Sequence, residues 1–233
     1  MDDLLDYLQE IGFEDLYLRQ ARSTLESGSR ARQQAAGPGS SKGREERERC
    51  LAELEMESRD CMLCGLSRGR QRVVFGSGDP DSDLMFIGEG PGAEEDRQGL
   101  PFVGPAGELL TKIIQAIGLE RDQVYIANIV KCRPPKNRDP QPEEVAACRR
   151  YLEGQIDLIE PKIIVLLGRV AAQTLLGNDL TLGRMRDQWH RVREIEARVT
   201  YHPAALLRNA SFKRPTWEDM QAVRDRLAEV SVG

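Results

Sequence analysis

The chain has 233 residues, 40% of them hydrophobic, which is enough for one domain with a substantial core plus an appendage. No apolar run approaches the roughly 20 residues that a bilayer requires, and the acidic start MDDLLDYLQE lacks the basic and apolar regions of a secretory signal. We therefore expect a cytoplasmic protein without a membrane partner. The net charge of −5 argues at first against nucleic acid as a partner. However, residues 1–26 alone hold seven acids and two arginines, so the rest of the chain sums to zero and leaves room for a basic face.

The first 43 residues differ in composition from the rest. Apolar residues between positions 3 and 24 recur at helical spacing, which predicts an amphipathic helical appendage over residues 1–26. Residues 27–43 (SGSRARQQAAGPGSSKG) have almost no apolar side chain to bury and indicate a flexible linker. We expect the N-terminal helix to dock an unidentified protein, and the main domain to span residues 44–233.

From residue 44 onward the pattern is that of an α/β domain. A charged helical stretch is followed by short buried-strand runs at 84–88, 124–130, 162–168 and 198–203, with helical stretches between them at 105–118, 142–160 and 170–177. Strands that are almost continuously apolar and alternate with helices predict a four-stranded, mostly parallel sheet covered on both faces. Such sheets bind ligands at the carboxyl ends of their strands.

Cysteines suggest a metal centre. Cys61 and Cys64 form a C-x2-C pair, and Cys132 and Cys148 form a second, wider pair. Without an export signal, reduced thiols are expected, and four thiolates suit either a structural zinc ion or a 4Fe–4S cluster. The spacing does not separate the two metals, and ordinary buried cysteines are the alternative for any single position. Cys50, on the charged helix, is left over.

A glycine-rich turn, GEGPG at residues 88–92, follows the first buried strand. It lacks the G-x-G-x-x-G spacing of dinucleotide-binding turns, and Pro91 removes a backbone N–H that could have bound phosphate. What remains is a tight turn that lets a ligand approach the backbone closely, with Glu89 at the mouth of the site.

Three longer motifs carry a family resemblance. They are GEGPGAEEDRQGLPFVGPAGELL (88–110), NIVKCRPPKNRDP (128–140) and YHPAALLRN (201–209). Together with the cysteines they resemble the family 4 uracil-DNA glycosylases, in order and from about Cys61 to the C-terminus. Gly90 stands where family members often carry alanine.

The resemblance implies a three-layer α/β/α sandwich and a 4Fe–4S cluster bound by the four paired cysteines. It also implies a monofunctional glycosylase that flips uracil out of DNA, hydrolyses its N-glycosidic bond and leaves an abasic site, which initiates base excision repair. Uracil-containing DNA is then the partner, and we expect a monomer.

The family motifs assign the residues that hold uracil. Phe102 is the stacking platform, although a core phenylalanine is the plain alternative from the residues alone. Asn128 closes a buried strand, where an amide can present a donor to O4 and an acceptor to N3–H of uracil; a structural strand cap is the alternative. His202, in the HP motif, contacts uracil O2 and stabilises the charge of the leaving base. Backbone at Gly90 and Pro91 lines the pocket.

Water must be positioned on the opposite side of the sugar. Glu89 and Glu95 are the acidic candidates, Asn137 positions the water or a backbone phosphate, and Asp96 is a further candidate. The division of labour among them stays open, and a solvated loop residue is the alternative for each. His190 has no comparable motif and is expected to be structural.

After the HP motif, Leu206 and Leu207 fit an apolar wedge that fills the gap left by the extruded base. Burial at a helix start is the alternative for either leucine. Basic side chains near the motifs are candidates for phosphate contacts, with a solvated basic face as the alternative: Arg133, Lys136, Arg138, Arg208, Lys213 and Arg214.

Three other functions compete with this interpretation. The cysteine site could support DNA binding without catalysis. A related class traps DNA covalently through a histidine that follows an arginine pair, but the corresponding stretch TLGRMRDQWHRV has no such histidine. A zinc deaminase needs H-x-E paired with P-C-x-x-C, and neither histidine here lies in that setting.

Overall fold

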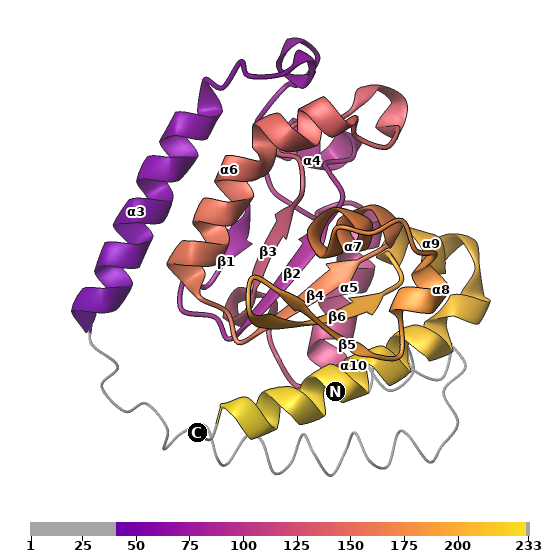
Figure 1. Ribbon diagram of the computed structural model, residues 1–233. Helices are drawn as coiled ribbons and strands as arrows, with labels where there is room; N and C mark the ends of the chain where they lie inside the picture. Colours follow the sequence, from indigo (N-terminus) through magenta and orange to yellow (C-terminus); the bar gives the residue numbers. More distant parts are fainter. Residues whose placement is uncertain (1–40, 232–233) are drawn as a thin grey trace.

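The computed structural model describes residues 41–231 (Figure 1). The predicted appendage and most of the predicted linker lie outside these residues. The helices and strands follow one another in this order: α3 (Ser41–Arg59), β1 (Ser77–Gly78), β2 (Leu84–Gly88), α4 (Ala93–Gln98), α5 (Pro105–Ala116), β3 (Tyr125–Asn128), α6 (Pro142–Ile159), β4 (Ile163–Leu167), α7 (Arg169–Leu176), α8 (Leu182–Met185), β5 (Trp189–Val192), β6 (Ile195–Thr200), α9 (Pro203–Arg208) and α10 (Lys213–Val230). Helix α3 begins at Ser41, so it includes the last residues of the predicted linker.

The described strands form one six-stranded sheet in the order β1-β3-β2-β4-β6-β5. Its four central strands are mutually parallel and correspond to the four predicted strands. Two edge strands, β1 and β5, add to them in antiparallel orientation, so the expected count of four was too low. Neither edge strand carries a buried apolar run: β1 has two residues, and Trp189 to Arg191 of β5 are largely accessible to solvent.

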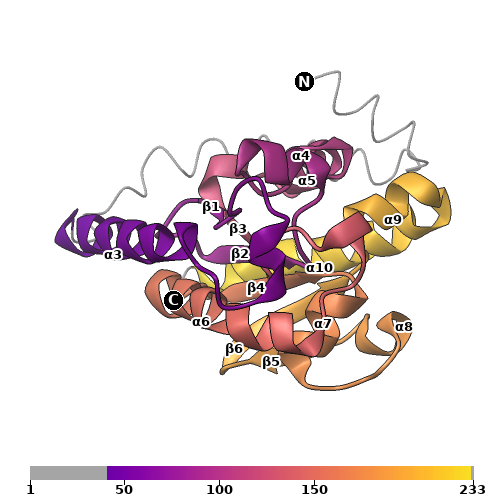
Figure 2. The same ribbon diagram turned by 90° about the horizontal axis from the view of Figure 1, so that it is seen from above.

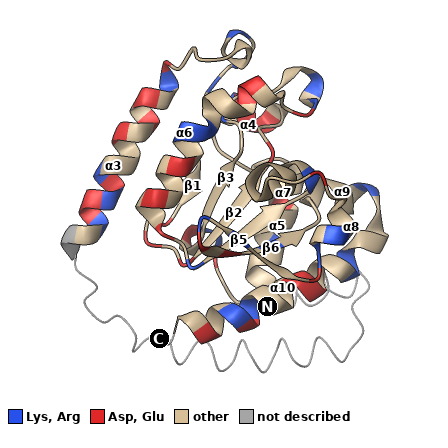
Figure 3. Cartoon of the chain, viewed as in Figure 1, with Lys and Arg blue, Asp and Glu red and all other residues tan. Residues whose placement is uncertain are grey.

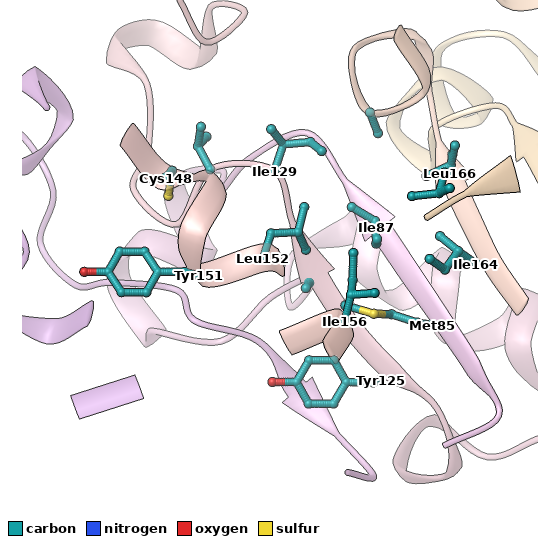
Figure 4. Close-up of a cluster of buried hydrophobic side chains, with 14 of the residues drawn as sticks. Met85, Ile87, Tyr125, Ile129, Cys148, Tyr151, Leu152, Ile156, Ile164 and Leu166 are labelled. Carbon is teal, nitrogen blue, oxygen red and sulfur yellow. The ribbon is translucent and has the colours of Figure 1, made fainter. Parts of the chain in front are cut away.

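Helices cover both faces of the sheet, as the sequence predicted (Figure 2). Strand residues alternate between the two faces: Met85 and Ile87 pack toward α6 and α7, whereas Leu84 and Phe86 pack toward α5 and α10. The first of these two cores is shown in Figure 4, where side chains of α6 meet those of the central strands and Cys148 lies at one end. Burial of this apolar surface on both faces stabilises the layered arrangement.

Helix α3 lies along the outer side of α6 (Figure 1). Gly154 makes the close approach possible, because a Cβ added there would lie 2.7 Å from a methyl group of Leu54. Arg47 donates to the carbonyl of Ile159 at 2.9 Å and so caps the end of α6. Figure 3 shows acidic and basic residues intermixed along the surface of α3. This helix therefore extends one outer layer of the domain.

The ends of the parallel strands fix where a ligand can bind. Strand β2 ends at Gly88, β3 at Asn128 and β6 at Thr200, and residues 88 and 128 are paired in the sheet. The three family-like motifs therefore leave the sheet at the same edge.

Within residues 41–231, each helix is too short or too polar to traverse a lipid bilayer.

Candidate active site

A cavity of about 380 Å³ opens at this edge of the sheet. Ten residues predicted from the sequence for the active site or for DNA contacts line it: Glu89, Gly90, Pro91, Glu95, Phe102, Asn128, Asn137, Arg138, His202 and Arg208. They come from the end of β3 and from the loops and short helices that follow three of the parallel strands. Residues separated by more than a hundred positions in the chain are thus brought together around one cavity.

Two rings form one wall of the cavity. The rings of Phe102 and His202 are stacked, with centroids 5.5 Å apart and planes inclined by 30°. Phe102 has a φ of 52°, a left-handed conformation that is costly for a residue with a bulky side chain. Strain of this kind persists where the surrounding structure fixes the ring, so Phe102 is held in place rather than packed loosely.

Asn128 lies at the end of β3 with only 1% of its surface exposed. Its Oδ1 atom is buried and has no hydrogen-bond partner within the described residues. An unpaired buried acceptor costs about 1–3 kcal/mol, and this cost is recovered when a donor binds. The unsatisfied oxygen therefore marks a position where a ligand can donate a hydrogen bond.

His202 is held as a neutral imidazole. Its Nδ1 atom accepts the backbone N–H of Ala204 at 3.1 Å, so the ring hydrogen is on Nε2. Burial, reinforced by the positive charge of Arg208, lowers the pKa of His202 from 6.5 to about 4. At neutral pH the ring is therefore a hydrogen-bond donor without a full positive charge.

The two glutamates of the cavity have different environments. Burial, and secondly the charge of Asp139, raises the pKa of Glu89 from 4.5 to about 7. Glu95 instead accepts the backbone N–H groups of Val103 and Gly104 with one oxygen, each at 3.0 Å. Glu95 thereby fixes the turn directly after Phe102, whereas Glu89 keeps a carboxyl group that can exchange a proton near neutral pH.

Asp139 was not among the sequence candidates, although it lines the cavity and lies two residues after Asn137. It forms an ion pair with Arg169, the first residue of α7. The same two residues border a second hollow of about 640 Å³ between α6 and α7. The negative charge of Asp139 helps to raise the pKa of Glu89, so Asp139 influences the site electrostatically.

The remaining candidates are spread around the mouth. Asn137 is exposed and accepts Arg133 Nε at 2.8 Å. Leu207 is 53% exposed at the end of α9, whereas Leu206 is 3% exposed and packs inward. Asp96 lies outside the cavity lining, is buried and accepts the backbone N–H of Gln71 at 2.9 Å, which indicates a structural tie.

Some of the predicted phosphate contacts have partners within the chain. Arg138 forms a two-pronged pair with Glu144, and Arg214 pairs with Glu218. His190 bonds the backbone oxygen of Met185 at 2.6 Å on the edge strand β5, in keeping with the expected structural role.

The four paired cysteines line a single small cavity about α6 and the C-x2-C loop. Among the described residues, no three His, Cys, Asp or Glu side chains are grouped tightly enough to hold one metal ion. Burial raises the pKa of Cys132 from 9.0 to about 11 and also raises that of Cys148. Metal ligation would have to offset this preference for the neutral thiols.

Donors surround the sulfur atoms of this cavity. Arg70 donates to Cys132 Sγ at 3.4 Å and to the carbonyl of Cys61 at 2.7 Å, and the backbone N–H of Lys131 donates to Cys148 Sγ at 3.2 Å. Four cysteine sulfur atoms with N–H donors and basic residues around them match the chemistry of a thiolate-bound iron–sulfur cluster. The residues present therefore fit such a group.

Together, the parallel sheet and a cavity lined by an aromatic ring, an amide and a neutral imidazole define an α/β protein with a candidate ligand site at the carboxyl ends of its strands. The chain belongs to the uracil DNA glycosylase superfamily, whose sequence profile matches residues 75–221. This confirms the resemblance inferred from the three motifs.

Two type-4 uracil-DNA glycosylases are similar to this chain over about three quarters of its length. It is 45% identical over 184 residues to the type-4 uracil-DNA glycosylase of Sulfurisphaera tokodaii, which covers 75% of this chain and 84% of the relative. Identity to the type-4 uracil-DNA glycosylase of Thermotoga maritima is 41% over 184 residues, covering 76% of this chain and 95% of the relative. A type-5 uracil-DNA glycosylase of Thermus thermophilus is 37% identical over 122 residues, which are 46% of this chain and 55% of that protein.

Proposed function

We propose that the protein is a monofunctional uracil-DNA glycosylase: it extrudes uracil from DNA, hydrolyses the N-glycosidic bond and leaves an abasic site for base excision repair. The observation that carries the proposal is the buried, unpartnered Oδ1 of Asn128 in a cavity shared with Phe102 and His202. The names of the relatives, which are glycosylases acting on uracil in DNA, support the same substrate.

Recognition follows from hydrogen-bond complementarity. Extrusion of a base costs a few kcal/mol, and stacking on Phe102 offsets part of that cost. Asn128 Oδ1 accepts N3–H of uracil and its amide nitrogen donates to O4. Cytosine presents no hydrogen at N3 and an amino group in place of O4, so both contacts would become unfavourable.

Bond cleavage requires stabilisation of the departing base. As the glycosidic bond breaks, negative charge develops on uracil O2, and the Nε2–H of His202 donates to it. This hydrogen bond strengthens as negative charge develops on O2, so it stabilises the transition state more than the bound substrate. The incoming water then loses a proton, and the ionised carboxylate of Glu89 is the base best suited to accept it. Asn137 orients the water or the adjacent phosphate.

Glu95 contributes through position. Its two hydrogen bonds to the turn after Phe102 hold the stacking platform in place. Backbone at Gly90 and Pro91 completes the cavity wall, where no large side chain would leave room for the base.

The surface around the cavity suits DNA. Leu207 is the better placed wedge because its side chain is exposed, whereas Leu206 would first have to leave the core. Arg208 lines the cavity mouth and is the basic residue expected to contact a phosphate there. Basic residues of α8 and α9 lie near this end of the molecule in Figure 3.

A 4Fe–4S cluster is proposed as the cofactor, held by Cys61, Cys64, Cys132 and Cys148. Hydrolysis of a glycosidic bond transfers no electrons, so the group would supply a structural cross-link. Cys132 and Cys148 bracket the loop that carries Asn137, and cross-linking them would fix that loop against α6.

Three further proposals come from the sequence. Residues 1–26 form a helical appendage that docks an unidentified protein, and residues 27–43 link this appendage to the catalytic domain. The catalytic domain acts as a monomer, and the protein is cytoplasmic.

The direct test uses an oligonucleotide with one uracil, incubated with the protein and cleaved with alkali. Strand cleavage at uracil is expected, with a thymine-containing strand left intact. His202→Ala should reduce the rate about 10²–10³-fold, whereas His190→Ala, outside the cavity, should retain most of it. Binding of uracil-containing DNA without any abasic product would favour a non-catalytic DNA-binding module instead.

A further inference from the structure

Lys131 is a buried lysine between the two sites described above. Only 1% of its surface is exposed, and it belongs to the loop that connects β3 to α6. Its ammonium donates to the backbone carbonyl of Asn128 at 3.0 Å. The same loop residue therefore holds the strand end from which the proposed uracil-reading amide projects.

The ammonium is fixed from its other side by Gln155 of α6. Lys131 Nζ donates to Gln155 Oε1, while Gln155 Nε2 donates to the carbonyl of Phe75 at 2.9 Å and to the hydroxyl of Tyr125 at 3.1 Å. Gly76 leaves space for this network, because a Cβ added there would lie 2.8 Å from Gln155 Nε2. A fully hydrogen-bonded buried network of this kind defines one geometry for its members.

Among residues 41–231, no carboxylate accepts a hydrogen bond from the Lys131 ammonium. Within the described residues, the hydrogen-bond acceptors of the Lys131 ammonium are a carbonyl and an amide oxygen, both neutral. Burying an unpaired ammonium is costly. On its other flank Lys131 lines the cysteine cavity, and its backbone N–H donates to Cys148 Sγ at 3.2 Å. A cluster ligated by four thiolates carries net negative charge, which is the counter-charge that this lysine lacks.

We propose that Lys131 is a positioning residue that couples the two sites: its ammonium offsets the charge of the thiolate-bound cluster and, through the Asn128 carbonyl, holds the uracil-reading end of β3. The inference rests on the proposed function and its cofactor. It predicts that removal of one positive charge affects both retention of iron and affinity for uracil, although Lys131 does not line the uracil cavity.

The test compares three purified variants with the wild-type protein. Lys131→Met removes the charge with an apolar side chain of similar length. Gln155→Met alters the same buried network but leaves the ammonium and its bond to Asn128. Lys162→Met removes a half-exposed lysine that pairs with Asp83 at 3.3 Å, and serves as the control for charge.

Two measurements are made on each protein: the half-life of bound iron in the presence of an iron chelator, and the inhibition constant of free uracil in the excision assay. For Lys131→Met we expect iron to be lost several-fold faster and the inhibition constant to rise about tenfold, with a smaller change in kcat. Gln155→Met should retain iron as the wild type does, and Lys162→Met should match the wild type in both measurements.

The outcomes separate the possible failures. Wild-type iron retention or wild-type uracil inhibition in Lys131→Met would overturn the proposal, even if the variant were less stable to heat. Equally fast iron loss in Gln155→Met would overturn it too, because loosening of the core would then be the cause. Wild-type protein that holds iron but releases no uracil would refute the proposed function, while the iron comparison would still decide the role of the charge. Wild-type protein without iron would refute the cofactor and the charge role together.

Discussion

Glu89 and Glu95 have the same side chain and line the same cavity, but their different surroundings favour different roles. Glu95 is committed to two backbone N–H groups, which fixes its position. Glu89 is buried near Asp139, so its ionised form is disfavoured and its pKa rises to about 7. A carboxyl group that titrates near neutral pH can take up a proton during turnover.

Replacement of Glu89 by Gln is expected to increase stability while reducing activity. Because the pKa of Glu89 is raised from 4.5 to about 7 in the folded state, its carboxyl lowers the stability progressively as pH rises through that interval. The Gln variant avoids this loss. For a partly solvated group we expect about 1 kcal/mol at pH 8, or about 2–4 °C in Tm, and no difference near pH 4.

Thermal unfolding at both pH values measures this effect. Glu94→Gln, at an exposed residue paired with Arg97, is the matched control and should show no such gain at pH 8. Excision by the wild type should rise with pH through about 7, and equal activity of Glu89→Gln across that range would exclude Glu89 as the proton acceptor.

The amide of Asn128 is expected to set the choice of base. Asn128→Asp replaces the amide donor by a second acceptor, so the contact to O4 of uracil becomes repulsive and the penalty against cytosine falls. Release from U·G, U·A and C·G duplexes should show slower uracil excision and a smaller ratio of uracil to cytosine release. Asn178→Asp, in the loop after α7 and outside the cavity lining, is the control. Unchanged selectivity in Asn128→Asp would remove the reader role.

At the scale of the elements, the pairing of β2 with β3 places Asn128 beside Gly88 at the cavity. Gly88 and Asn128 are register partners, and a Cβ at residue 88 would lie 2.5 Å from Asn128 Oδ1 and 2.6 Å from the Phe102 ring. The strand end must therefore be glycine for both side chains to face the same space. The sequence motif contains this glycine, but only the strand register explains it.

Gly88→Ala should accordingly damage the site more than the fold. We expect the added methyl group to displace Phe102 or Asn128 and to lower kcat/KM at least tenfold, because neither neighbour can move without losing its contact with the base. Gly183→Ala in α8 meets no atom within 4 Å and is the matched control. The two variants are compared in the excision assay and by circular dichroism; a fully active Gly88→Ala protein would contradict the proposed placement of uracil.

Sequence patterns predicted the strands whose burial is continuous and the helices whose burial recurs at helical spacing. The runs of β2 and β4 and the helices α5 and α6 match the structure within two residues at each end, because each has an apolar pattern matched to its surroundings. Strands β1 and β5 escaped prediction because tertiary pairing, and not composition, makes them extended. Helix α10 was also missed: its buried residues are separated by charged ones and include the polar Thr216 and Asp219.

At the scale of the whole molecule, motif order was enough to predict which loops meet, since parallel strands deliver their carboxyl ends to one edge. What the motifs could not reveal are contacts between distant segments. The tie of Glu95 to residues 103 and 104, the pair of Asp139 with Arg169 and the reach of Lys131 to Gln155 all depend on side-chain packing in three dimensions. The tie of Glu95 positions a residue that the sequence had already selected, whereas Asp139 and Lys131 are residues that the motifs did not single out.

The cysteine cavity lies where the loop after α3, helix α6 and the loop between β3 and α6 meet. The C-x2-C loop follows α3, Cys148 lies on α6, and Cys132 lies in the loop between β3 and α6, which also carries Asn137 of the cavity at the strand ends. Loss of one ligand should therefore affect assembly of the whole domain. For Cys132→Ala we expect loss of most bound iron together with most of the soluble protein, measured as iron per chain and yield after centrifugation. Cys50→Ala, on α3 and outside the cavity lining, should keep both. A well-folded, fully active Cys132→Ala protein would show that the four thiols are not a structural centre.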